Sequence, residues 1–218
     1  MFAKEKLDYQ AVALPDRLDM NDAQALKAVT EHLAFMRKRH SVREFAPTPV
    51  PREIIDAAVT AAGSAPSGAN HQPWHFVAIS SADVKHQIRL AAEAEEEKFY
   101  AGGASDEWIK ALEPIGTNDH KPHLTDAPWL IVVFAQRYGE FDDGVRYKNY
   151  YVPESVGIAT GFLLVALHKA GLVSLTHTPN PMKFLNELLG RPASEKATMI
   201  IAVGHPSKEA TIPQVATI

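Results

Sequence analysis

The sequence contains no cysteine, and this absence excludes several kinds of chemistry. Disulfides, thiolate nucleophiles and cysteine-ligated zinc sites all require that side chain. Long apolar runs are also lacking, since residues 127–135, one of the longest, fall well short of the roughly 20 residues that cross a bilayer. The first 22 residues are mixed and charged, without the apolar core of a signal peptide. We therefore expect a cytoplasmic protein.

An excess of positive charge is lacking as well. The 218 residues carry a formal net charge of −4, whereas a general nucleic-acid binder is usually basic. Histidines are present, but Pro73 lies between His71 and His75 and breaks the helical spacing that a metal-binding pair needs. His120 and His123 lie in a polar region without a clear third ligand. We predict no metal site.

What the sequence does contain is an alternation of helical and extended patterns. Helices are predicted at residues 22–39, 52–63, 81–100, 154–171 and 182–189, strands at 74–80, 128–136, 172–175 and 198–203, and loops at 64–73 and 137–151. This alternation predicts an α+β or α/β class with a helix-covered sheet. We expect a single domain over residues 1–218, with an N-terminal arm over 1–21 and a mobile lid over 101–126 that holds one short helix around Trp108.

Two short segments suggest a ligand. Residues 39–43, R-H-S-V-R, combine two arginines with a hydroxyl, and guanidinium groups match phosphate oxygens. Residues 65–69, A-P-S-G-A, form a turn of small residues in which Gly68 allows backbone to approach a ligand closely. Each segment also has an ordinary interpretation, as a solvated helix end and as a helix-to-strand turn. Together they suggest a phosphorylated planar cofactor.

Three later features point to a second ligand. Glu96 and Tyr100 lie one helical turn apart and share a face, so a carboxylate beside a phenol could receive an ammonium group. Lys121, in the polar region that follows, could pair with a carboxylate. Thr178 precedes Pro179, which favours extended backbone and a hydroxyl that points sideways. An exposed acidic helix face and a simple strand-ending turn are the ordinary alternatives.

Taken together, these segments resemble the FMN-dependent nitroreductase-like flavoproteins, and within them the iodotyrosine deiodinase branch. The motifs that carry the resemblance are R-H-S-V-R-E-F at 39–45, V-P-R-E-I-I-D at 50–56, A-P-S-G-A-N-H-Q-P-W-H-F-V at 65–77, V-K-H-Q-I-R at 84–89, T-D-A-P at 125–128, T-H-T-P at 176–179, L-L-G-R-P at 188–192 and V-G-H-P-S-K-E-A-T at 203–211. The E-x-x-x-Y of residues 96–100, Lys121 and the final P-S-K-E-A-T are more specific to the deiodinase branch.

The resemblance implies a mixed, mainly antiparallel sheet wrapped by helices, in an intertwined homodimer with FMN at its interface. The FMN contacts that it implies are Arg39, His40, Ser41, Val42, Arg43, Pro66, Ser67, Gly68, Thr176, His177 and Thr178. The loop at 66–68 would serve the flavin of the partner subunit. The Thr178 hydroxyl would act catalytically as the donor to flavin N5, which favours one-electron steps.

The resemblance also implies a substrate site. Glu96, Tyr100 and Lys121 look like the residues that clamp an amino-acid zwitterion, and the backbone N–H of Ala69 looks like the donor to a substrate phenolate. The implied reaction is reductive removal of halide from a halogenated tyrosine or halophenol, with NADH, NADPH or a reductase as electron donor. The alternatives are a broad nitroreductase or quinone reductase that acts on nitroaromatics or quinones, a flavin-binding protein without turnover, and a flavin-cleaving enzyme of cobalamin base synthesis.

The sequence departs from the family pattern in three places. His40 stands where the family has an arginine, and His177 stands where it has a threonine. Residues 212–218 contain no basic residue, although family members usually continue into a basic segment that adds an arginine at the flavin phosphate. Either phosphate binding relies on Arg39 and Arg43, or the natural chain continues beyond this sequence.

Overall fold

The computed structural model of the protein describes residues 7–217. Two compact units make up the chain, the first ending at Arg39 and the second beginning at His40. The predicted N-terminal arm over residues 1–21 is therefore seen only from residue 7, because residues 1–6, like Ile218, lie outside the described range.

The first unit consists of an irregular segment followed by helix α1 (Asp22–Met36). A capping box begins the helix, since the Asn21 side chain accepts from the Gln24 N–H and the Gln24 side chain accepts from the Asn21 N–H, both at 3.0 Å. The helix ends three residues earlier than the predicted range of 22–39. None of the described side chains of this helix is buried.

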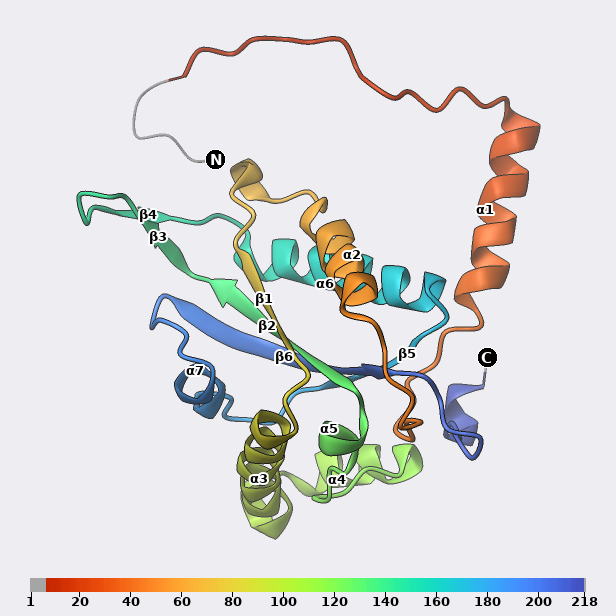
Figure 1. Ribbon diagram of the computed structural model, residues 1–218, viewed down its shortest axis with the longest axis vertical. Helices are drawn as coiled ribbons and strands as arrows, with labels where there is room; N and C mark the ends of the chain where they lie inside the picture. The colour runs from red at the N-terminus through yellow and green to blue at the C-terminus, as the bar shows by residue number, and fades with distance from the viewer. Residues whose placement is uncertain (1–6, 218) are drawn as a thin grey trace. The chain divides into compact units, whose positions relative to one another are not determined.

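The second unit is built on a four-stranded sheet of β1 (Trp74–Ile79), β2 (Trp129–Gln136), β6 (Glu195–Gly204) and β5 (Val173–His177) (Figure 1). The strands lie in the order β1-β2-β6-β5, and each neighbouring pair is antiparallel. One parallel bridge joins Ser41 to Ser174 at the edge of β5. The predicted mainly antiparallel character of the sheet is confirmed, and among the described residues the parallel contact is confined to this isolated bridge.

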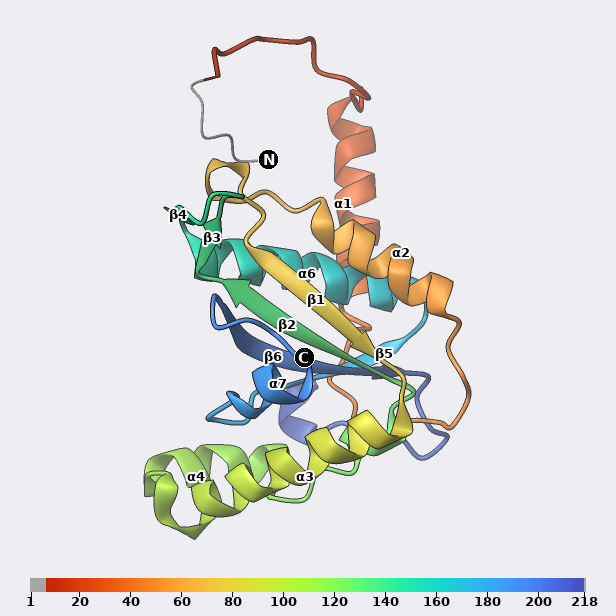
Figure 2. The ribbon, with the colours of Figure 1, turned by 60° about the vertical axis from the view of Figure 1, so that its left-hand side comes forward.

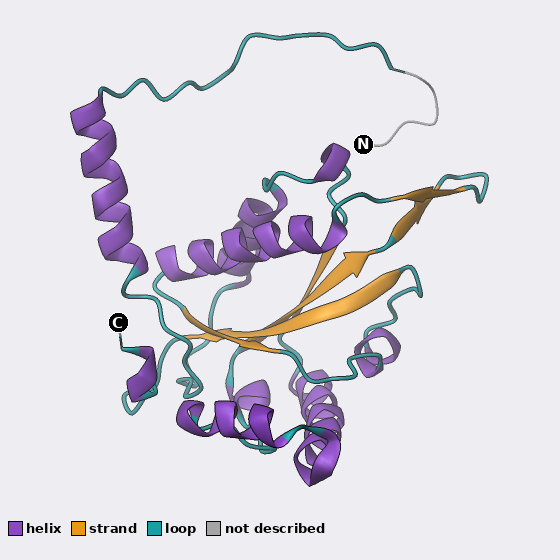
Figure 3. Cartoon of the chain, turned by 180° about the vertical axis from the view of Figure 1, so that it is seen from behind, coloured by secondary structure: helices purple, strands orange, loops and turns teal. Residues whose placement is uncertain are grey.

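Helices cover both faces of this sheet (Figures 2 and 3). Helices α2 (Arg52–Gly63) and α6 (Val152–Lys169) lie on one face, and α3 (Ala82–Lys98), α5 (His123–Asp126) and α7 (Phe184–Leu188) lie on the other. Strand β2 supplies Ile131 and Val133 to the first layer, and Leu130 and Val132 to the second. Because helices cover both faces of the sheet, β2 is apolar along its whole length, and this continuous apolar sequence is what predicts a buried strand at residues 128–136.

The predicted lid follows α3. It comprises the π-helical turn η2 (Phe99–Gly103), helix α4 (Asp106–Leu112), the turn η3 (Glu113–Ile115) and α5. The short helix expected around Trp108 is therefore confirmed. The buried Lys85 of α3 donates to the carbonyls of Thr125 and Ala127, at 3.1 and 2.6 Å, and so fastens α5 to α3.

The predicted loop at 137–151 instead contains a small hairpin of β3 (Tyr138–Glu140) and β4 (Arg146–Lys148). Its strands are too short and too polar to show a period, so the pattern predicted a loop. The remaining elements are the short turns η1 (Gly68–Asn70) and η4 (Gln214–Ala216). Among residues 7–217, no helix combines the length and the apolar character needed to cross a membrane.

Candidate functional site

Residues 41–46 lie along the edge of the sheet, between β5 and the C-terminal segment. The N–H of Val42 donates to the carbonyl of Ser174 at 3.3 Å, and the N–H of Ala46 donates to the carbonyl of His205 at 2.8 Å. These contacts place the predicted anion-binding segment beside Ser174 in β5, and the T-H-T-P motif begins two residues farther along that strand.

Side chains alternate between the two sides of this edge. Ser41, Thr176 and Thr178 are exposed, whereas Val42 and His177 are buried. In the part of the chain that the structure describes, the three exposed hydroxyls have no hydrogen-bond partner, so they are available to a ligand. The Val42 side chain belongs to the interior and the His177 imidazole turns toward α3, so a ligand at this edge would meet only the backbone of these two residues.

A cavity of about 260 Å³ opens beside the half-buried Arg43. Its lining residues are Arg43, Glu44, Glu113, Pro114, Ile115, Gly116, Thr211, Ile212 and Pro213. His40 is half-buried in the same unit, and Arg39 ends the first unit, where its N–H donates to the Met36 carbonyl at 3.0 Å. A guanidinium with exposed hydroxyls on adjoining segments fits a phosphorylated group of the FMN type.

The loop that begins at Pro66 is held in an unusual backbone conformation. Ala69, Asn70 and Gln72 have φ values of 50°, 55° and 50°, in the left-handed region that non-glycine residues rarely occupy. The Ser67 hydroxyl accepts from the Gln72 N–H at 2.9 Å and is thus used within the loop. Ala69 is an exposed residue, and its N–H has no hydrogen-bond partner among residues 7–217.

Gly68 packs this loop against the start of α6. Its N–H donates to the Ser155 hydroxyl at 3.1 Å, and a Cβ at this position would lie 2.4 Å from the carbonyl oxygen of Tyr150. Only glycine fits so close to another backbone. Within this chain the close approach at Gly68 is to the backbone of residue 150, and the approach of this loop to a ligand stays a prediction.

Strand β1, which the loop leads into, and strand β5 form the two opposite edges of the four-stranded sheet. Trp74, which follows the loop, pairs with Ala135 in the part of the sheet that β5 does not reach, whereas His177 pairs with Ile200 farther along. Strand β1 then runs for six residues, roughly 20 Å, toward α3 (Figure 1). A single chain therefore does not bring the 66–69 loop to Thr178.

Glu96, Tyr100 and Lys121 do come together. The Lys121 ammonium lies 3.1 Å from Glu96 Oε2 and donates to the Thr117 hydroxyl at 3.2 Å. The Tyr100 hydroxyl donates to the carbonyl of Thr117 at 3.3 Å. Sequence reasoning missed Thr117, which joins two of the three predicted residues, because a threonine in a polar loop has no distinguishing pattern.

The electrostatics of this cluster depend on burial. Burial raises the pKa of the Tyr100 phenol, opposed by its bond to Thr117, so the hydroxyl remains a hydrogen-bond donor. Burial, with the nearby charge of Lys121, lowers the pKa of His123 to about 3. Burial, with His123 and Lys121, also lowers the pKa of His177 to about 3. Since both imidazoles are neutral at physiological pH, Lys121 is the charged partner of Glu96.

The two imidazoles lie directly beside this ion pair. Their rings are edge-to-face at 5.3 Å, and the His177 Nε2 is 3.9 Å from Glu96 Oε1. The Nε2 atoms of His123 and His177 are buried without a hydrogen-bond partner in the described residues. No group of three or more acidic or histidine side chains among the described residues could hold a metal ion. The cluster is thus suited to a ligand that carries its own positive and negative charges.

The fold is an antiparallel sheet with helices on both faces, and Arg43 and the exposed hydroxyls of Ser41, Thr176 and Thr178 lie along one edge of that sheet. These features indicate an α+β protein that binds a phosphorylated cofactor. Residues 36–205 match the model of the Nitroreductase family, and the chain belongs to that family. The family expected from the sequence is thereby confirmed.

Within the Nitroreductase family, the chain is similar to proteins named iodotyrosine deiodinase. The chain is 50% identical over 188 residues to the iodotyrosine deiodinase of Haliscomenobacter hydrossis, covering 86% of this chain and 85% of that protein. It is 45% identical over 193 residues to iodotyrosine deiodinase 1 of Homo sapiens, covering 88% of this chain and 67% of the human protein. The matched region spans 65% of the length of the iodotyrosine deiodinase of Daphnia pulex and 61% of the length of that of Danio rerio.

A solved structure agrees with these relatives. The crystal structure of oxidized iodotyrosine deiodinase bound to FMN and 3-iodo-L-tyrosine matches this chain with a TM-score of 0.70 at 31% identity, covering 81% of this chain and 90% of that one.

Proposed function

We propose that this protein is an FMN-dependent oxidoreductase that removes halide reductively from a halogenated tyrosine. The observation that carries the proposal is the convergence of Glu96, Tyr100 and Lys121 beside the sheet edge that carries Thr178. The relatives named iodotyrosine deiodinase and the related structure with FMN and 3-iodo-L-tyrosine support it.

The cofactor would be held at the edge formed by residues 41–43 and the end of β5. Arg43 supplies a cation, and Ser41, Thr176 and Thr178 supply exposed hydroxyls, with Arg39 and His40 as further contacts. Bound FMN would supply the electrons that replace the carbon–halogen bond by a carbon–hydrogen bond, with uptake of a proton and release of halide. The Thr178 hydroxyl would donate to the flavin at N5, and NAD(P)H or a reductase would deliver the electrons.

The substrate would be held by its zwitterion. Its ammonium would face Glu96, and its carboxylate would face Lys121 and the protonated Tyr100 hydroxyl. The side chains of Glu96 and Lys121 are only 14% and 4% exposed, so attraction between opposite charges is stronger here than at the surface. The neutral His123 and His177 do not compete with the ammonium for the carboxylate.

The Ala69 N–H would meet the substrate phenolate in a second copy of the chain. The 66–69 loop leads into β1 and Thr178 follows β5, and these two strands are opposite edges of the sheet, so a complete site would combine the two chains of a homodimer. Exposed apolar residues on α6, Ile158 and Phe162, support an association through that helix.

The test removes the charge of Glu96. Glu96→Gln should weaken binding of 3-iodotyrosine, followed by flavin fluorescence, about ten- to a hundredfold, because a charge-assisted contact contributes roughly 1.5–3 kcal/mol. Binding of 4-nitrophenol, which has no zwitterion, should change far less.

Glu97→Gln is the matched control, since Glu97 is an exposed acid on the same helix. Equal weakening of both ligands by Glu96→Gln would contradict the clamp and favour a broad nitroreductase.

A further inference from the structure

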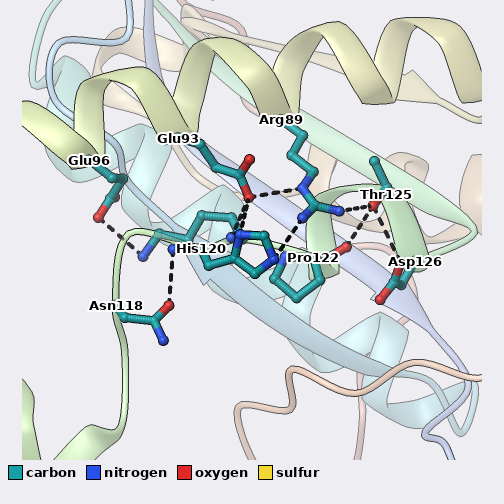
Figure 4. A network of polar contacts seen from close by, with 9 residues as sticks. Arg89, Glu93, Glu96, Asn118, His120, Pro122, Thr125 and Asp126 are labelled. Carbon is teal, nitrogen blue, oxygen red and sulfur yellow. Dashed lines mark hydrogen bonds and ion pairs between the residues drawn. The ribbon is translucent and has the colours of Figure 1, made fainter.

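Helix α3 contacts the segment that contains Lys121, and a second set of charged residues on the helix makes these contacts. Arg89 and Glu93 lie one helical turn apart, on the side of α3 that faces residues 118–126 (Figure 4). Glu96 follows within the next turn of the same helix. The helix therefore presents the predicted substrate carboxylate and, next to it, a set of contacts to the segment that supplies its cationic partner.

Glu93 is the centre of these contacts. Its Oε1 accepts from the backbone N–H of Lys121 at 2.7 Å and from Arg89 Nε at 2.9 Å, and His120 Nδ1 lies 3.4 Å away. Burial disfavours the charge, but the hydrogen bonds from Lys121 and Arg89 outweigh it and lower the pKa of Glu93. The ionised carboxylate of Glu93 thus hydrogen-bonds the backbone of Lys121, and the Lys121 side chain remains available to pair with Glu96.

Arg89 also contacts the residues on either side of Lys121 in the sequence. Its Nη1 donates to the Thr125 hydroxyl at 2.9 Å, and its Nη2 lies 3.2 Å from His120 Nε2. A guanidinium has only donors, so His120 Nε2 must accept, and the ring proton is then on Nδ1, facing Glu93. The His120 imidazole completes a closed ring of contacts between α3 and residues 120–125.

We propose that Glu93 and Arg89 are positioning residues for the substrate clamp. They fix the backbone at Lys121 against α3, so that its ammonium faces Glu96 before a ligand arrives. A lysine side chain on an untethered loop would have to be ordered during binding, at a cost in affinity for any ligand that uses its charge. The inference rests on the proposed function, because the ligand in question is the amino-acid zwitterion.

The consequence of breaking this contact is local. Lys85 fastens the carbonyls of Thr125 and Ala127 to α3 independently of Glu93. Loss of the Glu93 carboxylate should therefore release residues 118–122 while α5 stays in place. This separation makes a substitution at Glu93 a test of position rather than of folding.

The experiment compares Glu93→Ala, Glu93→Gln and the control Glu97→Ala in the FMN-loaded protein. Glu93→Ala should raise the Kd for 3-iodotyrosine about tenfold more than the Kd for 4-nitrophenol. Glu93→Gln should recover most of the affinity, because its amide oxygen can still accept from Lys121. Amide hydrogen exchange at Lys121 should accelerate in Glu93→Ala and remain slow in Glu97→Ala.

Faster exchange at Lys121 with an unchanged Kd for 3-iodotyrosine would overturn the proposal, and so would an equal loss for both ligands. The proposed function has a separate criterion. If the wild-type protein does not prefer 3-iodotyrosine to 4-nitrophenol, or if Glu96→Gln has no effect, that function fails. The positioning of Lys121 by Glu93 is then decided by the exchange measurement, with slow exchange in Glu93→Ala refuting it.

Discussion

At the scale of single residues, His123 and His177 make the interior of this protein sensitive to acid. Both imidazoles are buried, and the pKa of each is about 3, compared with 6.5 for an exposed histidine. Between these pH values the unfolded chain binds protons that the folded chain does not. Stability is therefore complete above pH 6.5 and decreases as the pH falls toward 3.

We predict that acidification to about pH 5 costs about 2 kcal/mol for each of these imidazoles, because pH 5 lies about 1.5 units below the pKa in the unfolded chain and each unit contributes about 1.4 kcal/mol. Urea unfolding of wild-type protein and of His123→Gln, at about pH 7.5 and about pH 5, measures this cost. The variant should lose roughly half of the pH dependence that the two histidines produce. An identical pH dependence in both proteins would show that His123 does not carry this effect.

At the scale of elements, the sequence is sufficient to predict a strand or helix where apolar residues follow one another in a regular pattern along one segment. The core strands β1, β2 and β6 were predicted near their observed positions because their apolar residues are continuous. The acidic run of α3 was also recognised, and Glu96 was singled out by its spacing to Tyr100, but Glu93 could not be distinguished from its exposed neighbours. Glu93 and Glu96 face Lys121, whereas Glu97 faces solvent, and this difference arises only when residues 117–126 fold back over the helix.

The turn before β1 gives a prediction at the same scale. Gly68→Ala would place a methyl group against the Tyr150 backbone, so it should lower the free energy of unfolding by about 1–3 kcal/mol. Gly63→Ala is the matched control, because nothing lies within 4 Å of a Cβ there. As the last residue of α2, it should gain about 0.5–1 kcal/mol in the same urea titration. Equal stability of both variants would contradict the close approach at residue 68.

At the scale of the whole molecule, exposed apolar surface on α6 supports the proposed homodimer. Ile158 and Phe162 are each 43% exposed, and a Cβ at Gly157 or Gly161 would meet open space. These residues share one side of the helix, and that side is free for a second copy to approach closely.

We predict that Ile158→Glu weakens a homodimer and lowers FMN affinity along with it, because the 66–69 loop would then lose its place at the second site. Sedimentation equilibrium and flavin titration measure the two effects. Leu90→Glu is the control, since Leu90 is an exposed apolar residue of α3, on the opposite side of the sheet from α6. A dimer that both substitutions leave intact would contradict an interface at α6.

The arrangement of α3 also limits how the chain can change in length. Each residue turns a helix by about 100°, so one residue inserted between Arg89 and Tyr100 would rotate the contacts of Glu93 or Glu96 away from Lys121. The stretch from Gly102 to Gly116 lies outside the contacts of Glu93 and Glu96, and a Cβ at either of these two glycines would meet nothing within 4 Å. Insertions and deletions among related chains should therefore gather in that stretch and spare the helix before it.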